Sequence, residues 1–316
     1  MEEKKGNSRY LAVGLKGMAM GAADVVPGVS GGTIAFITGI YGELLYSIKS
    51  VDLTAMKLLF TGRFRQFWTK VNGNFLASLI AGIAVSIFSL AKLMKWLLEN
   101  EPIGTWSFFF GLIIASALLV SRQVTKWNAG PIISLVAGIA IGYVITALSP
   151  TSTPDTWWFI ILSGAIAICA MILPGISGSF ILLLLGKYYY IMTAVSEFNI
   201  PVLLLFAVGA VAGIISFSHV LSWLLKNFYN VVVALLMGFM VGSLNKVWPW
   251  KQTLETYTDS HGVAQPLVEA NVLPSTYAGL YGDAHLMQSI LWCVAGLALI
   301  FVIEYAGKAV EKRRAR

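Results

Sequence analysis

The 316-residue chain contains few charged residues. Lys, Arg, Asp and Glu make up 12% of it, whereas about a quarter of the residues in a typical soluble domain carry charge. Hydrophobic residues make up 57%, and they form long apolar runs without the alternating pattern of transmembrane strands. The sequence therefore predicts an all-α polytopic membrane protein.

Several chemical signatures are also missing from the sequence. The two cysteines, Cys169 and Cys293, lie in apolar runs and provide no disulfide framework. The patterns GxGxxG and GxxxxGK[ST], metal-ligand spacings and a nucleophile constellation are all absent. The net charge of +7 arises from loops beside apolar runs and does not indicate nucleic-acid binding. We therefore expect no enzyme activity, no cofactor, no metal site and no ATP-driven transport.

One motif is present twice. Residues 27–41 read PGVSGGTIAFITGIY and residues 174–188 read PGISGSFILLLLGKY, with identical residues at seven of fifteen positions and a constant offset of 147. Similarity continues at an offset of 127, as in the pairs Gly82/Gly209 and Trp96/Trp223. The sequence therefore predicts two repeats, residues 1–150 and 151–316. About twenty additional residues lie in the first repeat.

Each repeat is predicted to contain a broken or re-entrant helical hairpin followed by three transmembrane helices. The first repeat has the hairpin 10–48, an amphipathic insertion 49–73 and spans 75–98, 105–121 and 131–149. The second has the hairpin 156–196, spans 201–225, 228–244 and 286–306, and a polar loop 245–285 without helical periodicity. In the insertion, apolar residues recur at helical spacing among basic ones, which favours an interfacial helix on an anionic leaflet. A solvated basic loop is the alternative.

The number of crossings predicts the relation between the repeats. A hairpin returns to its own side and three spans cross an odd number of times, so the two repeats are predicted to have inverted topology. The distribution of Lys and Arg agrees, because the insertion 49–73 and the terminal KRRAR fall on one side with the N-terminus. We therefore expect both termini in the cytoplasm and loop 245–285 outside.

A helix break inside a membrane exposes backbone groups that need partners. Such breaks are tolerated where they are buried in protein or line a cavity, and a matched pair indicates a transporter's binding site. Pro27 and Pro174 are the predicted helix breaks. The first N–H groups of the following half-helices, with nearby hydroxyls, form an anion site. The predicted phosphate-binding residues are Gly28, Ser30, Gly31, Gly32, Thr33, Gly175, Ser177, Gly178 and Ser179. Alternatively, the glycines serve close helix packing.

Five further residues are candidates for coupling or gating. Asp24 precedes the first break and can carry a proton or hold a cation, or it can cap exposed N–H groups. Glu43 can titrate as a gate or be solvated, and Lys187 can attract an anion or snorkel to the outer surface. His219 is a proton-relay candidate or a structural histidine, and Arg122 is a topology anchor or a lipid-phosphate ligand.

The stretch GAADVVPGVSGGTIAFITGIYGELL, together with ILPGISGSFILLLLGKYY, resembles the bacterial polyprenyl-phosphate transporter family. The resemblance covers nearly the whole chain. It implies transport of undecaprenyl phosphate from the outer to the inner leaflet of the bacterial cytoplasmic membrane, for carrier recycling in cell-envelope synthesis. It also implies roles at the matching positions, which are Asp24, Pro27, Gly28, Ser30, Gly31, Gly32, Pro174, Gly175, Ser177 and Gly178. The coupling ion, H⁺ or Na⁺, and homo-oligomer formation stay open.

Three other functions are compatible with parts of this pattern. A secondary transporter of a small soluble anion would use the same breaks but would need a laterally closed aqueous cavity. An enzyme acting on lipid phosphates would need acid–base or nucleophilic residues near the breaks, where only Asp24 is present. A non-transporting scaffold would not explain two matched polar breaks.

Overall fold

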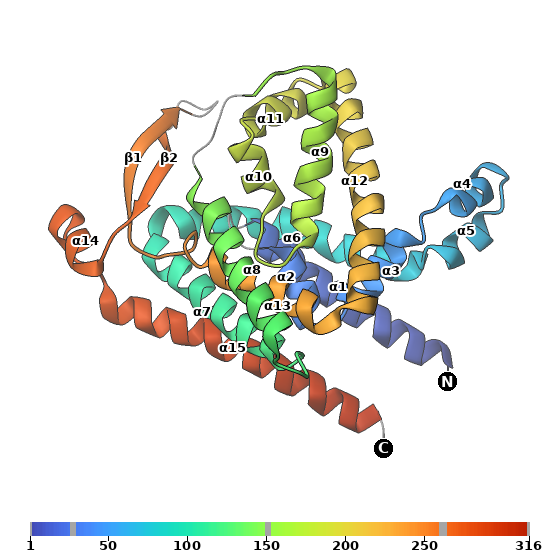
Figure 1. Cartoon of the computed structure of the whole chain (residues 1–316), viewed down its shortest axis with the longest axis horizontal. Helices are drawn as coiled ribbons and strands as arrows, with labels where there is room; N and C mark the ends of the chain where they lie inside the picture. Colours follow the sequence, from blue (N-terminus) through green and yellow to red (C-terminus); the bar gives the residue numbers. More distant parts are fainter. Residues whose placement is uncertain (1, 26–29, 149–152, 259–263, 315–316) are drawn as a thin grey trace.

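The computed structural model describes residues 2–25, 30–148, 153–258 and 264–314, and most of them are helical (Figure 1). The first half contains α1 (Glu2–Val25), α2 (Gly31–Ile37), α3 (Tyr41–Lys49), α4 (Leu53–Phe60), α5 (Phe64–Lys70), α6 (Gly73–Asn100), α7 (Pro102–Ser121) and α8 (Ala129–Ala147). The second half contains α9 (Trp157–Ile172), α10 (Gly178–Leu184), α11 (Tyr188–Ser196), α12 (Ile200–Asn227), α13 (Tyr229–Ser243), β1 (Lys251–Thr258), β2 (Ala264–Asn271), α14 (Pro274–Tyr281) and α15 (Leu286–Arg314).

Several of these helices can cross a membrane by length and composition. In the described residues, four do so as single helices: α7, α8, α12 and the part of α15 from Leu286 to Tyr305. Two bent pairs raise the number to six if each is one span: α5 with the start of α6, bent by 72°, and α10 with α11, bent by 112°. The chain is thus a multi-pass helical membrane protein.

The long helices pack in four pairs that recur between the halves. Helix α1 lies along α6, and α9 lies along α12, which are the matching helices of the two predicted repeats. The remaining spans exchange partners, because α7 packs on α15 and α8 packs on α13. The last helix of each half, α8 or α15, therefore packs against a helix of the other half.

Close glycine contacts hold the first two helix pairs together at matching positions. A Cβ at Gly82 of α6 would overlap the carbonyl oxygen of Gly14 in α1, and a Cβ at Gly209 of α12 would overlap that of Ile161 in α9. These two contacts match at the offsets that relate the repeats in the sequence. Small residues permit this backbone approach, which favours helix association in a membrane.

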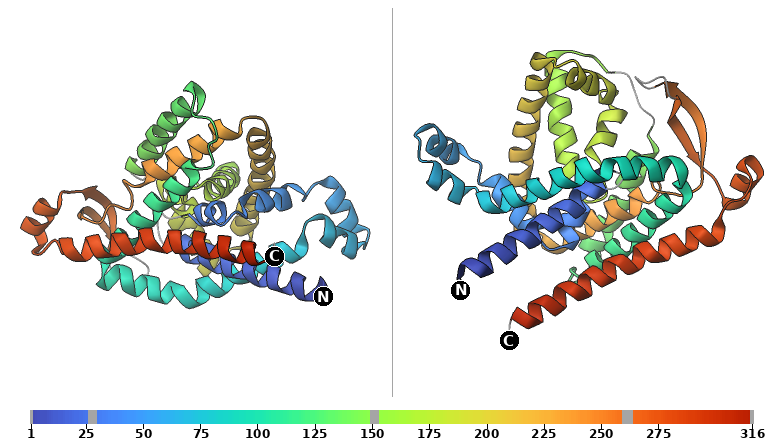
Figure 2. Two further views of the ribbon diagram at one scale, coloured as in Figure 1. Left: turned by 90° about the horizontal axis from the view of Figure 1, so that it is seen from below. Right: turned by 180° about the vertical axis from the view of Figure 1, so that it is seen from behind.

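The insertion after the first hairpin differs from the single interfacial helix predicted for it. It forms two short helices, α4 and α5, because Gly62 between them adopts a φ of +72° that ends the first helix. Large apolar side chains are exposed on both, including Leu53 (90%) and Phe60 (80%). The two helices project from the body on the side of the chain termini (Figures 1 and 2).

The loop 245–285 is more ordered than its sequence suggested. It contains the antiparallel pair β1–β2, with register shifts between Thr253 and Thr256, followed by the short helix α14. This segment lies at the end of the molecule opposite both termini in all three views (Figures 1 and 2). The sequence predicted only a polar loop without helical periodicity. It did not reveal the strands, because two short strands with an irregular register leave little alternation to detect.

Candidate functional site

The described part of each motif belongs to a helical hairpin. We call the residues beside each break the hairpin tip: Ser30 to Thr33 at the start of α2 in the first half, and Leu173 to Ser177 between α9 and α10 in the second. In the first half, Lys16 in the interior of α1 donates from Nζ to the carbonyl oxygen of Thr38 after α2 over 2.7 Å, which ties α1 to the end of α2. In the second half, Thr153 before α9 donates to the carbonyl oxygen of Leu185 after α10. Residues 26–29, including the predicted break Pro27 and the predicted ligand Gly28, lie outside the described residues.

The two tips contact each other directly. Ser30 Oγ donates to the carbonyl oxygen of Leu173 over 3.2 Å, and Tyr41 donates its hydroxyl hydrogen to that of Ile172 over 3.1 Å. In the opposite direction, the N–H of Gly175 donates to Oγ1 of Thr33 over 3.0 Å. Polar groups released at the second break are thus satisfied by the first hairpin, as a break buried in protein requires.

The leading N–H groups of the first half-helix, α2, are occupied by side chains of the same hairpin. Asp24 Oδ1 accepts from the N–H of Gly31 over 2.7 Å, and Ser30 Oγ accepts from the N–H of Gly32 over 3.1 Å. Asp24 therefore caps α2, which is one of the two roles predicted for it. Its predicted role as a carrier of a coupling ion stays a prediction.

Four glycines of the motifs have neighbouring atoms where a side chain would begin. A Cβ at Gly31 would overlap the Asp24 carboxylate, one at Gly32 would lie 2.5 Å from the carbonyl oxygen of Ile172, and one at Gly178 would lie 2.6 Å from that of Ala167. Gly175 has a φ of +85° and would bring a Cβ within 2.8 Å of the Met240 backbone. In this conformation these glycines serve close packing, and their use as phosphate ligands stays a prediction.

The second motif is capped differently from the first. Its N-cap residue Ser177 makes no side-chain hydrogen bond to the start of α10, and its hydroxyl instead lies 2.9 Å from that of Ser179. Ser177 is buried, whereas Ser179 is exposed. Pro174, the second predicted break, lies between α9 and α10 in a buried turn. The two tips are thus chemically unequal, as expected from Asp24 matching Met171 and Thr33 matching Phe180.

The other coupling and gating candidates bond to parts of the chain away from the tips. Lys187 is 1% exposed and donates to the carbonyl oxygen of Thr153 and to the Asp155 carboxylate. It therefore joins the segment before α11 to the segment before α9, at the end of the second hairpin away from its tip. Glu43 of α3 pairs with Arg9 over 2.6 Å and accepts from Asn72 over 2.9 Å. Both residues hold elements together here, and a gating role for either stays a prediction.

Arg122 and His219 lie on other helices. Arg122, at the end of α7, pairs with Glu304 of α15 over 3.5 Å. His219 is exposed on α12, and its Nδ1 lies 2.8 Å from the carbonyl oxygen of Ile215 in the preceding turn. Within the described ranges, no group of three His, Cys, Asp or Glu side chains is placed to hold a metal ion.

Tyr41 is the contact residue that sequence reasoning missed. Its hydroxyl bonds the end of α9, whereas in the sequence it is only the last residue of the first motif. The available signal was its recurrence as Tyr188 in the second motif.

Comparisons with known proteins agree with the paired motifs. A family model described as VCA0040-like, undecaprenyl phosphate translocase-like, matches residues 20–265. The chain belongs to this family. It is 46% identical over 301 residues to a polyprenyl-phosphate transporter of Vibrio cholerae serotype O1, covering 95% of this chain and 98% of that protein. It is 38% identical over 253 residues to a polyprenyl-phosphate transporter of Staphylococcus aureus, covering 74% of this chain and 85% of the relative. No solved structure matches it.

The family assignment confirms the resemblance that the two motifs indicated. The match begins at residue 20, ahead of the first motif, and runs through the second motif into the β1–β2 hairpin. Both predicted helix breaks and all nine predicted phosphate-binding positions lie inside it.

Proposed function

We propose that this chain translocates undecaprenyl phosphate across the bacterial cytoplasmic membrane, from the outer to the inner leaflet, so that the lipid carrier is recycled in cell-envelope synthesis. The observation that carries the proposal is its 46% identity, over almost its full length, to a protein named a polyprenyl-phosphate transporter. The multi-pass helical fold supports it. Transport direction and the length of the polyprenyl chain are parts of the proposal.

The proposed architecture is a pair of repeats with inverted topology, residues 1–150 and 151–316, with both termini in the cytoplasm. Matching helix pairs, α1 with α6 and α9 with α12, support the repeat. Equivalent glycine contacts at Gly82 and Gly209 support it further. Both termini lie at one end of the molecule and the β1–β2 hairpin lies at the other (Figure 2).

The proposed head-group path runs between the two hairpin tips. Here the N–H groups of Gly31 and Gly32 are bonded to Asp24 and Ser30 within the first hairpin, and the N–H of Gly175 is bonded to Thr33 across the two tips. An anion must displace Asp24 and Ser30 to reach the first pair, and the tips must separate before it can reach Gly175. Alternating rearrangement of the two repeats would supply that separation while the polyprenyl tail stays in lipid. An apolar cavity of about 220 Å³ beside the first hairpin, lined in part by Ala22, Ile34 and Phe109, offers a surface for the tail.

Transport is proposed to be coupled to H⁺ or Na⁺ through Asp24. The carboxylate lies against the N-terminus of α2 and bonds Gly31, so a change in its charge would alter the contact that joins the two sides of the first break. Ionisable groups at such depth are costly and commonly mark ion pathways.

The function can be tested in bacterial cells by measuring how much undecaprenyl phosphate is accessible from outside. Deleting the gene that encodes this protein should increase the amount of undecaprenyl phosphate accessible from outside, and re-expression should reverse the increase. An unchanged leaflet distribution, together with transport of a soluble anion into vesicles, would replace this proposal with the small-anion transporter. The control is a variant with both half-helix motifs disrupted, Ser30→Pro/Ser177→Pro, at equal membrane abundance.

A further inference from the structure

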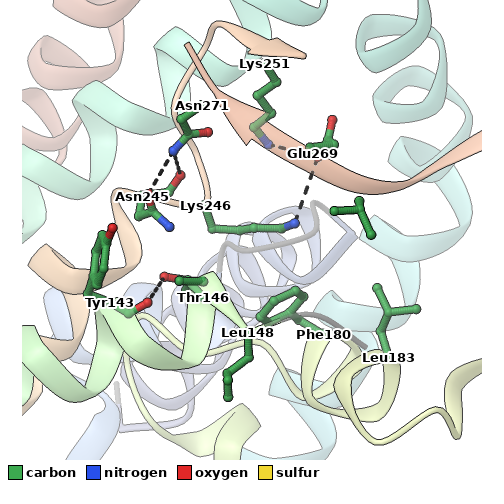
Figure 3. Close-up of a pocket in the computed structure, with 12 residues that line it drawn as sticks. Tyr143, Thr146, Leu148, Phe180, Leu183, Asn245, Lys246, Lys251, Glu269 and Asn271 are labelled. Atoms are coloured by element: carbon green, nitrogen blue, oxygen red, sulfur yellow. Dashed lines mark hydrogen bonds and ion pairs between the residues drawn. The ribbon is translucent and has the colours of Figure 1, made fainter. Parts of the chain in front are cut away.

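A polar pocket lies between the second hairpin and the β1–β2 hairpin. Its volume is about 310 Å³, and it is bounded by the end of α8, by α10 and by the hairpin strands (Figure 3). Phe180 and Leu183 of α10 contribute one wall, so the pocket adjoins the half-helix that begins at the second motif. None of its charged residues was a candidate site residue in the sequence.

Two lysines in this pocket share a single carboxylate. Lys251 Nζ lies 3.4 Å from Glu269 and Lys246 Nζ lies 4.0 Å from it. Both ammonium groups also face aromatic rings, at 4.0 Å from the Trp106 centroid and 4.8 Å from that of Phe180. Two cations against one anion leave a positive charge unbalanced among the described residues that line the pocket.

We propose that this lysine pocket, defined by Lys246, Lys251 and Glu269, is a docking site for the phosphomonoester head group of a polyprenyl phosphate before it reaches the hairpin tips. The inference rests on the proposed function for its choice of lipid. Lysine ammonium groups bind phosphate oxygens through charge-assisted hydrogen bonds, which strengthen where water is partly excluded.

The surroundings of the pocket suit a lipid better than a free ion. Tyr143 and Leu148, at the end of α8, line its rim and are 54% and 55% exposed. Two other apolar side chains of the same helix, Val136 and Val144, are 60% and 54% exposed. An isoprenoid tail can lie against this apolar helix while its phosphate enters between the lysines, so the ligand buries apolar surface in addition to pairing its charge.

The burial of the two lysines disfavours their charged forms. Burial lowers the pKa of Lys246 and lowers that of Lys251 to about 8, while Glu269 opposes both shifts. A phosphate beside the two ammonium groups would favour their charged forms and relieve part of this effect. Glu269 holds the lysines together and also competes with an incoming anion.

The proposal can be tested by measuring binding of farnesyl phosphate to the full-length protein in phosphatidylcholine nanodiscs. We expect Lys246→Gln/Lys251→Gln to weaken binding at least about tenfold, equivalent to about 1.4 kcal/mol. Lys226→Gln removes the same charge from the last turn of α12, outside the residues that line the pocket, and should leave the affinity unchanged. Glu269→Gln should strengthen binding, which a misfolded variant would not do.

Two ligand controls identify what the pocket recognises. Farnesol lacks the phosphate, and its binding should not respond to the lysine substitutions. Inorganic phosphate should compete only weakly, and competition as strong as that of farnesyl phosphate would show a soluble-anion site instead of a lipid site. If the affinity of the double lysine variant for farnesyl phosphate is within twofold of that of the wild type, the proposal that this pocket binds the head group is wrong. Lys246→Gln alone gives the same test if the double variant does not fold.

Measuring translocation in parallel separates this inference from the proposed function. If the lysine substitutions weaken binding but the wild-type protein does not translocate the lipid, the proposed docking site is supported and the transporter function is contradicted. If the wild-type protein translocates the lipid but the lysine substitutions do not change its affinity for farnesyl phosphate, the proposed function is supported and the proposed docking site is contradicted.

Discussion

The Asp24 carboxylate has a structural and a proposed functional task, and two substitutions separate them. Asp24→Asn keeps an oxygen that can accept from the Gly31 N–H, whereas Asp24→Ala removes it. We expect both variants to lose the dependence of transport on the ion gradient. Only Asp24→Ala should lose stability, by about 0.5–2 kcal/mol, as for other lost helix caps.

Proteoliposomes with an imposed H⁺ or Na⁺ gradient provide the first measurement, and thermal denaturation provides the second. Unchanged gradient dependence in Asp24→Asn would remove the coupling role while leaving the cap intact.

Lys251 gives a pH dependence whose sign follows from its burial. Its pKa is lowered to about 8, so raising the pH from 7.5 to 9 removes a positive charge that faces Lys246 and Glu269. We expect the affinity for farnesyl phosphate to fall over this interval. Lys251→Arg should flatten the profile, because a guanidinium stays charged throughout. Equal falls in both proteins would assign the titration to another group.

Single residues at the breaks were predicted from sequence, but their partners were not. The motif identified Ser30 and Thr33 as hydroxyls that can add donors to an anion site at the break. Their bonds to Leu173 and Gly175 join positions more than 140 residues apart. No local pattern encodes such a contact, because it depends on how the two hairpins meet.

At the scale of elements, the contact between hairpin tips depends on a buried hydrogen bond. Thr33 is 1% exposed, and its Oγ1 accepts from the Gly175 N–H. Thr33→Val keeps the shape of the side chain but leaves this N–H without its partner, so we expect a loss of about 1–3 kcal/mol. Thr33→Ser retains the hydroxyl and should recover most of the loss. Equal stability of Val and wild type in thermal denaturation would contradict the contact.

The paired helices depend on glycine at two matched positions. Gly82→Ala and Gly209→Ala each place a methyl group where a partner backbone lies, so each should destabilise the protein by about 1–3 kcal/mol. Gly42→Ala in α3 is the control, because a Cβ at that position would meet no atom within 4 Å. Thermal unfolding in detergent measures all three. Similar losses at Gly82 and Gly209 are expected if the helix pairs are equivalent.

The long helices were well predicted because hydrophobic length is a strong signal. The predicted spans 105–121, 131–149 and 201–225 correspond to α7, α8 and α12, which are long and apolar enough to cross a membrane. Short elements were predicted less well. Gly62 divides the insertion into two helices, and the strands β1 and β2 pair with an irregular register that periodicity does not reveal.

At the scale of the whole molecule, the exchange of helices between halves limits how the repeats can move. Helix α15 packs on α7 and α8 packs on α13, so neither half can be separated without breaking these contacts. The proposed rearrangement of the repeats would also break the bonds between the hairpin tips, where Ser30 bonds Leu173 and Gly175 bonds Thr33. This is the region that substitutions at Asp24 and Thr33 probe.

The most direct test of the central claim is the leaflet distribution of a fluorescent polyprenyl phosphate in vesicles that contain only this protein. A membrane-impermeant quencher reports how much probe stays in the outer leaflet. We expect wild-type vesicles to exchange the probe between leaflets, at a rate that falls in Lys246→Gln/Lys251→Gln and with no exchange of the matching polyprenyl alcohol above the protein-free rate. Exchange of the phosphate probe no faster than in protein-free vesicles would contradict the account.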